Sequence, residues 1–185
     1  MELEFFPIPG PILIRTRIFE DMRGGFTESF NLESFGKAQL PHAFVQDNQS
    51  ISKKGVIRGL HYQKPPFAQG KLVRVVKGSA LDVAVDIRTG SPTFGQHIRV
   101  LLSEHEPSQL WIPEGFAHGF SALEEGTCFL YKCTNYYSPQ HETGICWNDP
   151  ALGIDWGVEN PIVSEKDMAL PELKQSLNDF HYAQS

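Results

Sequence analysis

Several features that mark common protein classes are scarce in this chain of 185 residues. It has only three cysteines, an odd number without C-x-x-C spacing, so neither a disulfide framework nor a zinc site is expected. The longest apolar run near the start, residues 5–14, is broken by proline and glycine and is shorter than the ~20 residues of a membrane-spanning helix. The acidic Met-Glu-Leu-Glu start is unlike a secretory signal, so we expect a cytoplasmic protein.

Basic residues and standard enzyme signatures are also lacking. Lys and Arg total 16 against 22 Asp and Glu, a net charge of −6. This balance offers no general attraction to nucleic acid or to an anionic membrane, so neither is expected as a partner. An anionic ligand must instead meet a local basic cluster. The patterns of P-loops, G-x-G-x-x-G loops, G-x-S-x-G elbows and H-E-x-x-H metalloproteases are all missing.

What is present favours one compact, β-rich domain over residues 1–185. Hydrophobic residues make up 41% of the chain, enough for a substantial core. The 16 glycines and 13 prolines indicate many turns between short elements, as in a sandwich or barrel. Strands are predicted near residues 12–17, 44–52, 56–62, 71–77, 79–87, 94–102, 109–112, 116–123 and 127–134.

The clearest strand alternation runs from Ser79 to Ile87, and Lys77-Gly78 before it is predicted to be a hairpin turn. Helices are predicted only at residues 32–38, capped by Asn31, and near residues 171–178. Both helices should lie outside the sheets.

A P-x-G-x-x-H pattern ends at His118 and places a histidine on a strand just after a tight turn. This arrangement resembles the second motif of cupins. A metal-binding cupin also has an H-x-H pair followed by Glu, but here His61 is followed by Tyr62 and Gln63, with Gln69 further on. Most ligands of a metal are therefore missing. We expect an all-β, cupin-type jelly-roll barrel with a few short peripheral helices and no metal.

Basic residues lie on predicted strands close to His61. If Arg58, Lys71 and Arg74 share the barrel interior with it, they form a cationic pocket that needs an anionic ligand. The same spacing equally fits a solvated sheet face.

Three other patterns have ordinary structural interpretations. Ser164 and Asp167 have the spacing of a helix capping box, Tyr131 is a common strand residue, and residues 23–26 could form a turn. Residue types alone therefore predict a pocket and no reaction.

Longer motifs stand in order along nearly the whole chain. They are residues 21–24 with Phe26 and Glu28, 46–48, 58–63, 70–75, 82–88, 90–95, 110–113, 115–120, 131–132, 147–150 and 166–167. Together they resemble the dTDP-4-dehydrorhamnose 3,5-epimerase family, whose members are metal-free cupins. The resemblance implies a cofactor-free isomerase of dTDP-L-rhamnose biosynthesis that converts dTDP-4-dehydro-6-deoxy-D-glucose to dTDP-4-dehydro-L-rhamnose.

The resemblance also implies residue roles. His61 is the base, oriented by Asp167, Lys71 stabilises the oxyanion, and Tyr131 is the acid on the opposite face of the sugar. Family members are homodimers, so some contacts can serve the neighbouring subunit's site. The implied substrate contacts are Arg23, Phe26, Glu28, Gln46, Asn48, Arg58, Lys71, His118, Glu142 and Lys166, with Tyr137 stacking on the thymine.

The implied chemistry suits these residue types. C3 and C5 of the sugar both adjoin the C4 carbonyl, so a base of near-neutral pKa can form an enolate beside a fixed cation. Two alternatives stay open: an epimerase of one carbon in a related dTDP-4-keto-deoxysugar, and a module that binds nucleotide sugars without chemistry. A metal-dependent cupin oxygenase is a more distant alternative.

Overall fold

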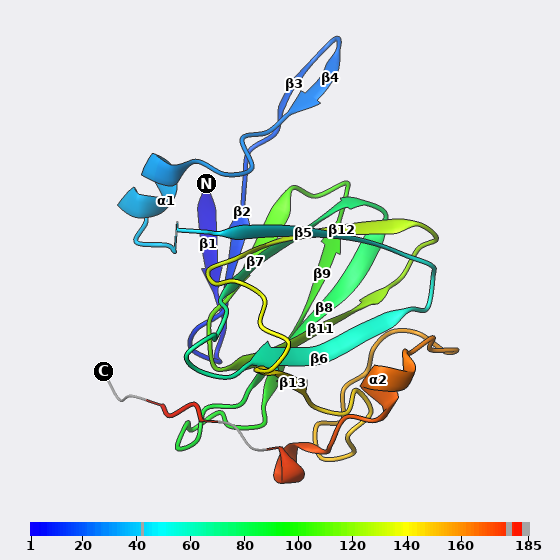
Figure 1. Cartoon of the computed structure of the whole chain (residues 1–185). Coiled ribbons are helices and arrows are strands. Elements are labelled where there is room, and N and C mark those ends of the chain that lie inside the picture. Colours follow the sequence, from blue (N-terminus) through cyan, green and yellow to red (C-terminus); the bar gives the residue numbers. More distant parts are fainter. Residues whose placement is uncertain (42, 177–178, 183–185) are drawn as a thin grey trace.

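Two antiparallel sheets form the body of the computed structural model, which describes residues 1–41, 43–176 and 179–182 (Figure 1). The six-stranded sheet has the order β1-β2-β10-β7-β12-β5, and the five-stranded sheet has the order β13-β6-β11-β8-β9. Buried side chains from both sheets meet in one core, which includes Val73 and Phe129 from the first sheet and Ala84 and Phe120 from the second. The predicted all-β barrel with short peripheral helices is confirmed.

All nine predicted strands are present within a few residues of their expected bounds. The first sheet contains β1 (Glu2–Phe5), β2 (Ile12–Arg15), β10 (Ser108–Ile112), β7 (Lys71–Lys77), β12 (Thr127–Cys133) and β5 (Gln46–Ser52). The second contains β13 (Glu142–Gly144), β6 (Ile57–Gln63), β11 (Phe116–Ala122), β8 (Ser79–Asp86) and β9 (His97–Ser103). A hairpin of β3 (Phe19–Asp21) and β4 (Gly24–Phe26) projects from the barrel (Figure 1). The strands β1, β3, β4 and β13 were not predicted, since three or four residues show too little alternation.

The predicted hairpin turn at Lys77-Gly78 is wrong. β7 ends at Lys77 and β8 begins at Ser79, but the two strands belong to different sheets, so the chain crosses between the sheets at Gly78. Gly78 has a φ of 74°, a left-handed conformation that glycine adopts without strain. A sharp turn of this kind fits a hairpin and a sheet-to-sheet corner equally well in sequence.

The helices are short and lie outside the sheets. Asn31 caps α1 (Leu32–Lys37) as predicted, its side chain accepting a hydrogen bond from the Ser34 amide at 3.0 Å. The second predicted helix is wrong within the described residues, where only a 3-10 turn, η1 (Leu173–Gln175), forms. The Pro171 carbonyl accepts a hydrogen bond from the Cys146 amide instead of continuing a helix. Residues 177–178 of that prediction lie outside the described residues.

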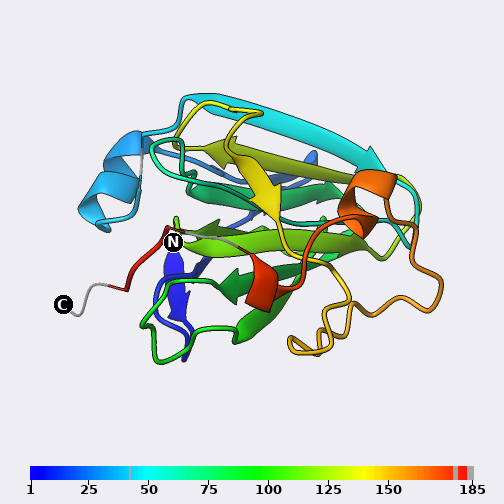
Figure 2. The ribbon, with the colours of Figure 1, turned by 60° about the horizontal axis from the view of Figure 1, so that its bottom comes forward.

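The chain after β13 covers the outer face of the five-stranded sheet (Figure 2). Val83, Val85 and Ile87 point outward and pack with Trp156 from this segment, whereas Ala80 and Ala84 point into the barrel. The predicted alternation along β8 is thus confirmed, with both faces buried. The same segment carries α2 (Glu165–Met168) to the edge of the barrel opening. Within the described residues, no helix has the length and apolar character needed to cross a membrane.

A buried carboxylate holds the end of β8. Asp86 is fully buried and accepts hydrogen bonds from the backbone and guanidinium of Arg88 and from the hydroxyls of Ser91 and Thr93. Burial alone raises the pKa of Asp86, but these hydrogen bonds outweigh it and hold the pKa below 3.8. The carboxylate therefore stays ionised at neutral pH and stabilises this turn.

Candidate active site

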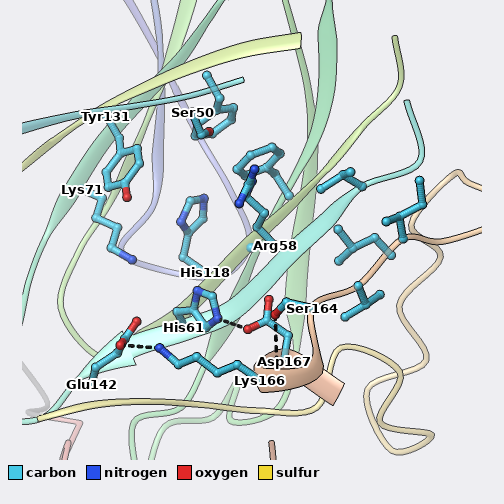
Figure 3. Close-up of a pocket in the computed structure, with 17 residues that line it drawn as sticks. Ser50, Arg58, His61, Lys71, His118, Tyr131, Glu142, Ser164, Lys166 and Asp167 are labelled. Carbon is cyan, nitrogen blue, oxygen red and sulfur yellow. Dashed lines mark hydrogen bonds and ion pairs between the residues drawn. The ribbon is translucent and has the colours of Figure 1, made fainter. Parts of the chain in front are cut away.

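A cavity of about 540 Å³ opens into the barrel between the two sheets (Figure 3). Its walls come from β5, β7 and β12 on one side, from β6 and β11 on the other, and from residues 162–167 beside α2. A second cavity, of about 320 Å³, adjoins the first because the two share His61, Lys71, Tyr131 and Glu142. The result is one elongated cleft in which four of the predicted site residues occupy the middle.

An irregularity in β6 turns Arg58 and His61 toward the same cavity. On β11, His118 pairs with His61, and Phe120, two residues later, pairs with Arg58. His118 and Phe120 are two apart on β11, so their side chains lie on the same face of the sheet. Their partners His61 and Arg58 therefore lie on one face as well, although they are three apart in sequence. The extra residue in β6 therefore adds a guanidinium to the wall that carries the histidine.

Two glycines make this irregularity sterically feasible. A Cβ atom on Gly59 would lie 2.6 Å from the Cα of Gly119, and Gly59 has a φ of 117°. A side chain at either position would push β6 and β11 apart. The pairing of His61 with His118 depends on this close backbone contact.

Asp167 connects His61 to α2. The Nε2 of His61 lies 2.7 Å from Oδ1 of Asp167, and the Gly59 amide donates to Oδ2 at 3.2 Å. The Asp167 amide donates to the Ser164 hydroxyl at 3.1 Å, so the predicted helix cap is confirmed in the same residue that contacts the histidine. Burial raises the pKa of Asp167, but the hydrogen bonds from His61 and Gly59 outweigh it and lower the pKa.

A second histidine and a lysine lie deeper in the barrel. His118 is buried, with its Nε2 2.9 Å from Oδ2 of the fully buried Asp82, a pairing that the sequence did not predict. Burial lowers the pKa of His118 and outweighs the opposing effect of Asp82. Burial also lowers the pKa of Lys71, against the opposing charges of Asp82 and Glu142. Lys71 thus presents to the cleft an amine that is shielded from bulk solvent.

Tyr131 stands on the opposite wall from His61. It lies on β12 of the six-stranded sheet, whereas His61 lies on β6 of the five-stranded sheet, and its hydroxyl points into the cavity (Figure 3). Burial raises the pKa of Tyr131 above its ordinary value. The phenol therefore stays neutral at pH 7 and can donate a proton.

Hydrogen bonds link the polar side chains that line the outer part of the cleft. Oε2 of Glu142 accepts hydrogen bonds from Lys166 at 2.5 Å and from the Tyr137 hydroxyl at 2.7 Å. The Tyr137 amide donates to Gln46, whose side chain donates to Asn48 at 3.0 Å. The structure thus brings five predicted contact residues to this part of the cleft.

Three predicted contact residues lie outside this chain's own cleft. Arg23 is at the tip of the projecting hairpin, with 86% of its side chain exposed, and it pairs with Asp21. Phe26 is also exposed, and Glu28 accepts a hydrogen bond from Asn31 beside α1. The structure therefore separates these three residues from His61 within one chain.

Arg74 does not join the cationic pocket. Alternation along β7 puts Lys71 and Val73 on the barrel side, so Arg74 points to the outer face and lines a separate cavity of about 90 Å³. The pocket's cations are Arg58, Lys71 and Lys166. No group of three or more His, Cys, Asp or Glu side chains suited to a metal is present in the described part of the chain.

Some cavity residues were missed by sequence reasoning. Ser50, Phe120 and Phe129 line the cavity without having been predicted to do so. The alternation of residues along β5 and β12 was the available signal, but it could not tell which face of each strand meets the cleft.

Comparisons with known proteins agree with this geometry. The family model described as dTDP-4-dehydrorhamnose 3,5-epimerase matches residues 6–175. The enzyme of that name from Salmonella typhimurium is 54% identical over 172 residues, covering 92% of this chain and 94% of the relative.

Two solved structures are also similar. One is an epimerase from Legionella pneumophila in complex with dTDP-4-keto-L-rhamnose, with a TM-score of 0.90, 47% identity and coverage of 94% of this chain and 93% of that one. Another is a 3'-monoepimerase from Streptomyces bikiniensis, with a TM-score of 0.87, 33% identity and coverage of 91% and 86%. This chain, with its cupin-like barrel, belongs to the dTDP-4-dehydrorhamnose 3,5-epimerase family.

Proposed function

We propose that this chain is an isomerase that converts dTDP-4-dehydro-6-deoxy-α-D-glucose to dTDP-4-dehydro-β-L-rhamnose. It does so by removing the protons at C3 and C5 and returning protons on the opposite face. The observation that carries this proposal is the placement of His61, held by Asp167, and Tyr131 on opposite walls of one cleft, with Lys71 between them (Figure 3).

His61 acts as the base in this proposal. Asp167 is ionised and accepts a hydrogen bond from the Nε2–H group of His61. Nδ1 therefore keeps the free lone pair that takes a proton from the sugar. The electrons of the broken C–H bond form a double bond between that carbon and C4. The π electrons of the C4 carbonyl move to its oxygen, which becomes an enolate oxygen beside the ammonium of Lys71. A cation held in place and shielded from bulk solvent stabilises that charge strongly.

Tyr131 completes each inversion. Its phenol gives a proton to the opposite face of the carbanionic carbon, and the C4 carbonyl re-forms. The proton that His61 took goes to solvent, and the phenolate regains one from solvent, so each epimerisation has no net proton change. C3 and C5 flank the same carbonyl, so one base, one acid and one cation can serve both carbons.

We also propose a homodimer in which the hairpin of one subunit completes the other subunit's site. Arg23, Phe26 and Glu28 lie away from their own cleft, and Phe26 and Phe19 of this hairpin are exposed. An exposed hairpin with apolar and charged residues suits contact with a second subunit.

A single-carbon epimerase is the alternative, because a 3'-monoepimerase shares the fold. Proton NMR of the product separates the two activities. Incubation with dTDP-4-dehydro-6-deoxy-D-glucose should give an L-configured ring, inverted at C3 and C5. Inversion at one carbon alone would support the monoepimerase, and unchanged sugar would indicate a binding module.

A further inference from the structure

Strand β5 presents a row of polar side chains to the cleft, and one member of the row lacks a partner. Gln46, Asn48, Ser50 and Ser52 alternate with exposed residues. Gln46 donates to Asn48, and Arg58 donates to the Ser52 hydroxyl at 3.1 Å. The Ser50 hydroxyl, in contrast, is shielded from solvent and has no hydrogen-bond partner among the described residues.

The surroundings of Ser50 make a structural role for its hydroxyl unfavourable. In the strand register Ser50 is opposite Phe129, which is fully buried and stacked on Phe120 with ring centroids 4.0 Å apart. A hydroxyl held against aromatic rings loses its hydrogen bonds to water without gaining others. Alanine would fill the same place without that loss, so the hydroxyl is better explained by a ligand that occupies the cavity.

The position of Ser50 indicates which part of a ligand it meets. It lies between Tyr131 and Arg58 along the wall of the cavity (Figure 3). In the proposed function, on which this inference rests, Tyr131 faces C3 and C5, and Lys71 faces the C4 oxygen. Arg58 is an implied substrate contact, and its guanidinium suits the diphosphate on C1. The ring carries free hydroxyls on C2 and C3, and the one on C2, next to the diphosphate-bearing C1, is the hydroxyl on the side of the ring toward Arg58.

We propose that the Ser50 hydroxyl hydrogen-bonds the C2 hydroxyl of the hexose ring and thereby positions C3 against the catalytic residues. A serine hydroxyl can donate or accept, so it can match either orientation of the sugar hydroxyl. A site built to bond a hydroxyl discriminates against a sugar that lacks it, because its own polar group is then left unpaired. Ser50 is thus a specificity-determining residue for sugars with oxygen at C2.

The test compares Ser50→Ala with the wild type on two sugars, dTDP-4-dehydro-6-deoxy-D-glucose and its 2-deoxy analogue. Ser50→Ala should lower kcat/KM about tenfold on the first sugar, the effect of one hydrogen bond, and leave kcat/KM on the analogue unchanged. For the wild type, kcat/KM should be about tenfold lower on the 2-deoxy analogue than on the first sugar. If the analogue reacts too slowly, dissociation constants of both sugars for His61→Ala and His61→Ala/Ser50→Ala give the same comparison.

The controls separate binding from folding and from the proposed function. Without ligand, the Ser50→Ala variant should have a melting temperature no lower than that of the wild type, because the Ser50 hydroxyl makes no hydrogen bond to any of the described residues. Ser121→Ala removes a buried hydroxyl that donates to the Trp156 carbonyl at 2.6 Å on the outer side of β11, so it should melt lower with unchanged kcat/KM. An equal loss on both sugars, or no loss on either, would overturn the assignment to C2. Failure of the wild type to convert the first sugar would instead refute the proposed function.

Discussion

His61 and Asp167 are 106 residues apart in sequence, yet the Nε2 of His61 lies 2.7 Å from Oδ1 of Asp167. Asp167 belongs to a one-turn helix whose cap, Ser164, accepts the Asp167 amide proton. Asp167 therefore takes part in the N-terminal cap of its helix and also orients the base. Because the lowered pKa of Asp167 keeps it ionised at neutral pH, it selects the histidine tautomer with the proton on Nε2.

Asp167→Asn should reduce kcat by at least about 100-fold with little change in KM, because the amide no longer selects this tautomer. Steady-state kinetics on the proposed substrate measure both constants. Ser164→Ala is the matched control: it removes the cap and about 1 kcal/mol of stability but keeps the carboxylate, so its kcat should fall far less. A wild-type kcat in Asp167→Asn would show that the carboxylate does not orient the base.

Tyr131→Phe should separate proton removal from inversion. The phenyl ring keeps the packing on β12, but no acid remains on that wall of the cleft. His61 can still remove a proton and return one to the same face. In heavy water, the recovered sugar should then carry deuterium with its original configuration. An L-configured product formed at the wild-type rate would assign the acid to another group.

The pH dependence of the activity should reflect the protonation of the Lys71 amine. Burial lowers its pKa below the ordinary 10.5, and a protonated amine is the form that stabilises an enolate. Activity should therefore fall as pH rises through this lowered pKa, and the fall should begin below pH 10.5. Lys71→Arg, whose guanidinium stays charged, should move the fall to higher pH, whereas Lys71→Met should lower kcat about 100-fold or more. An unchanged alkaline limb in Lys71→Arg would contradict the assignment.

Mixing two inactive variants tests the proposed exchange of hairpins between subunits. If Arg23 serves the partner's site, a mixed dimer of His61→Ala and Arg23→Ala chains contains one site with both native residues. Activity should return after the two variants are mixed and their subunits reassociate, because about one of the two sites in each mixed dimer is then active. If Arg23 serves its own chain, neither site is complete and activity stays absent. Light scattering of the same samples reports whether a dimer forms.

Asp86→Asn should destabilise the fold, because it removes the charge that holds Arg88, Ser91 and Thr93. We expect a loss of about 3 kcal/mol in unfolding free energy at pH 7, measured by denaturant titration. The pKa of Asp86 is lowered by folding, so this stabilisation is present above the unfolded value of 3.8 and is lost as pH falls through the folded value. The difference between variant and wild type should be constant from about pH 5 to 8 and shrink below pH 3.8. A difference that stays unchanged in acid would contradict this account.

Most strands could be predicted because alternation and turn residues are local signals, as along residues 79–86. The corner at Gly78 could not, because one left-handed glycine serves a hairpin and a change of sheet equally well. Likewise Arg58, Lys71 and Arg74 are all basic and near one another in sequence. Only the extra residue in β6 and the alternation in β7 decide that the first two face the cleft and the third does not.

The prediction of the reactive residues rests on the resemblance to a family. No local pattern connects Asp167 to His61, since the contact depends on how the segment after β13 returns to the barrel opening. The cytoplasmic location, the single domain and the individual residue roles stay predictions.

Deuterium incorporation from heavy water tests the central claim most directly. The wild type and His61→Ala are each incubated with dTDP-4-dehydro-6-deoxy-D-glucose, and NMR follows C3 and C5. The account predicts deuterium at both carbons of an L-configured product with the wild type, and at neither carbon with His61→Ala. Exchange at both carbons by His61→Ala at the wild-type rate would contradict it.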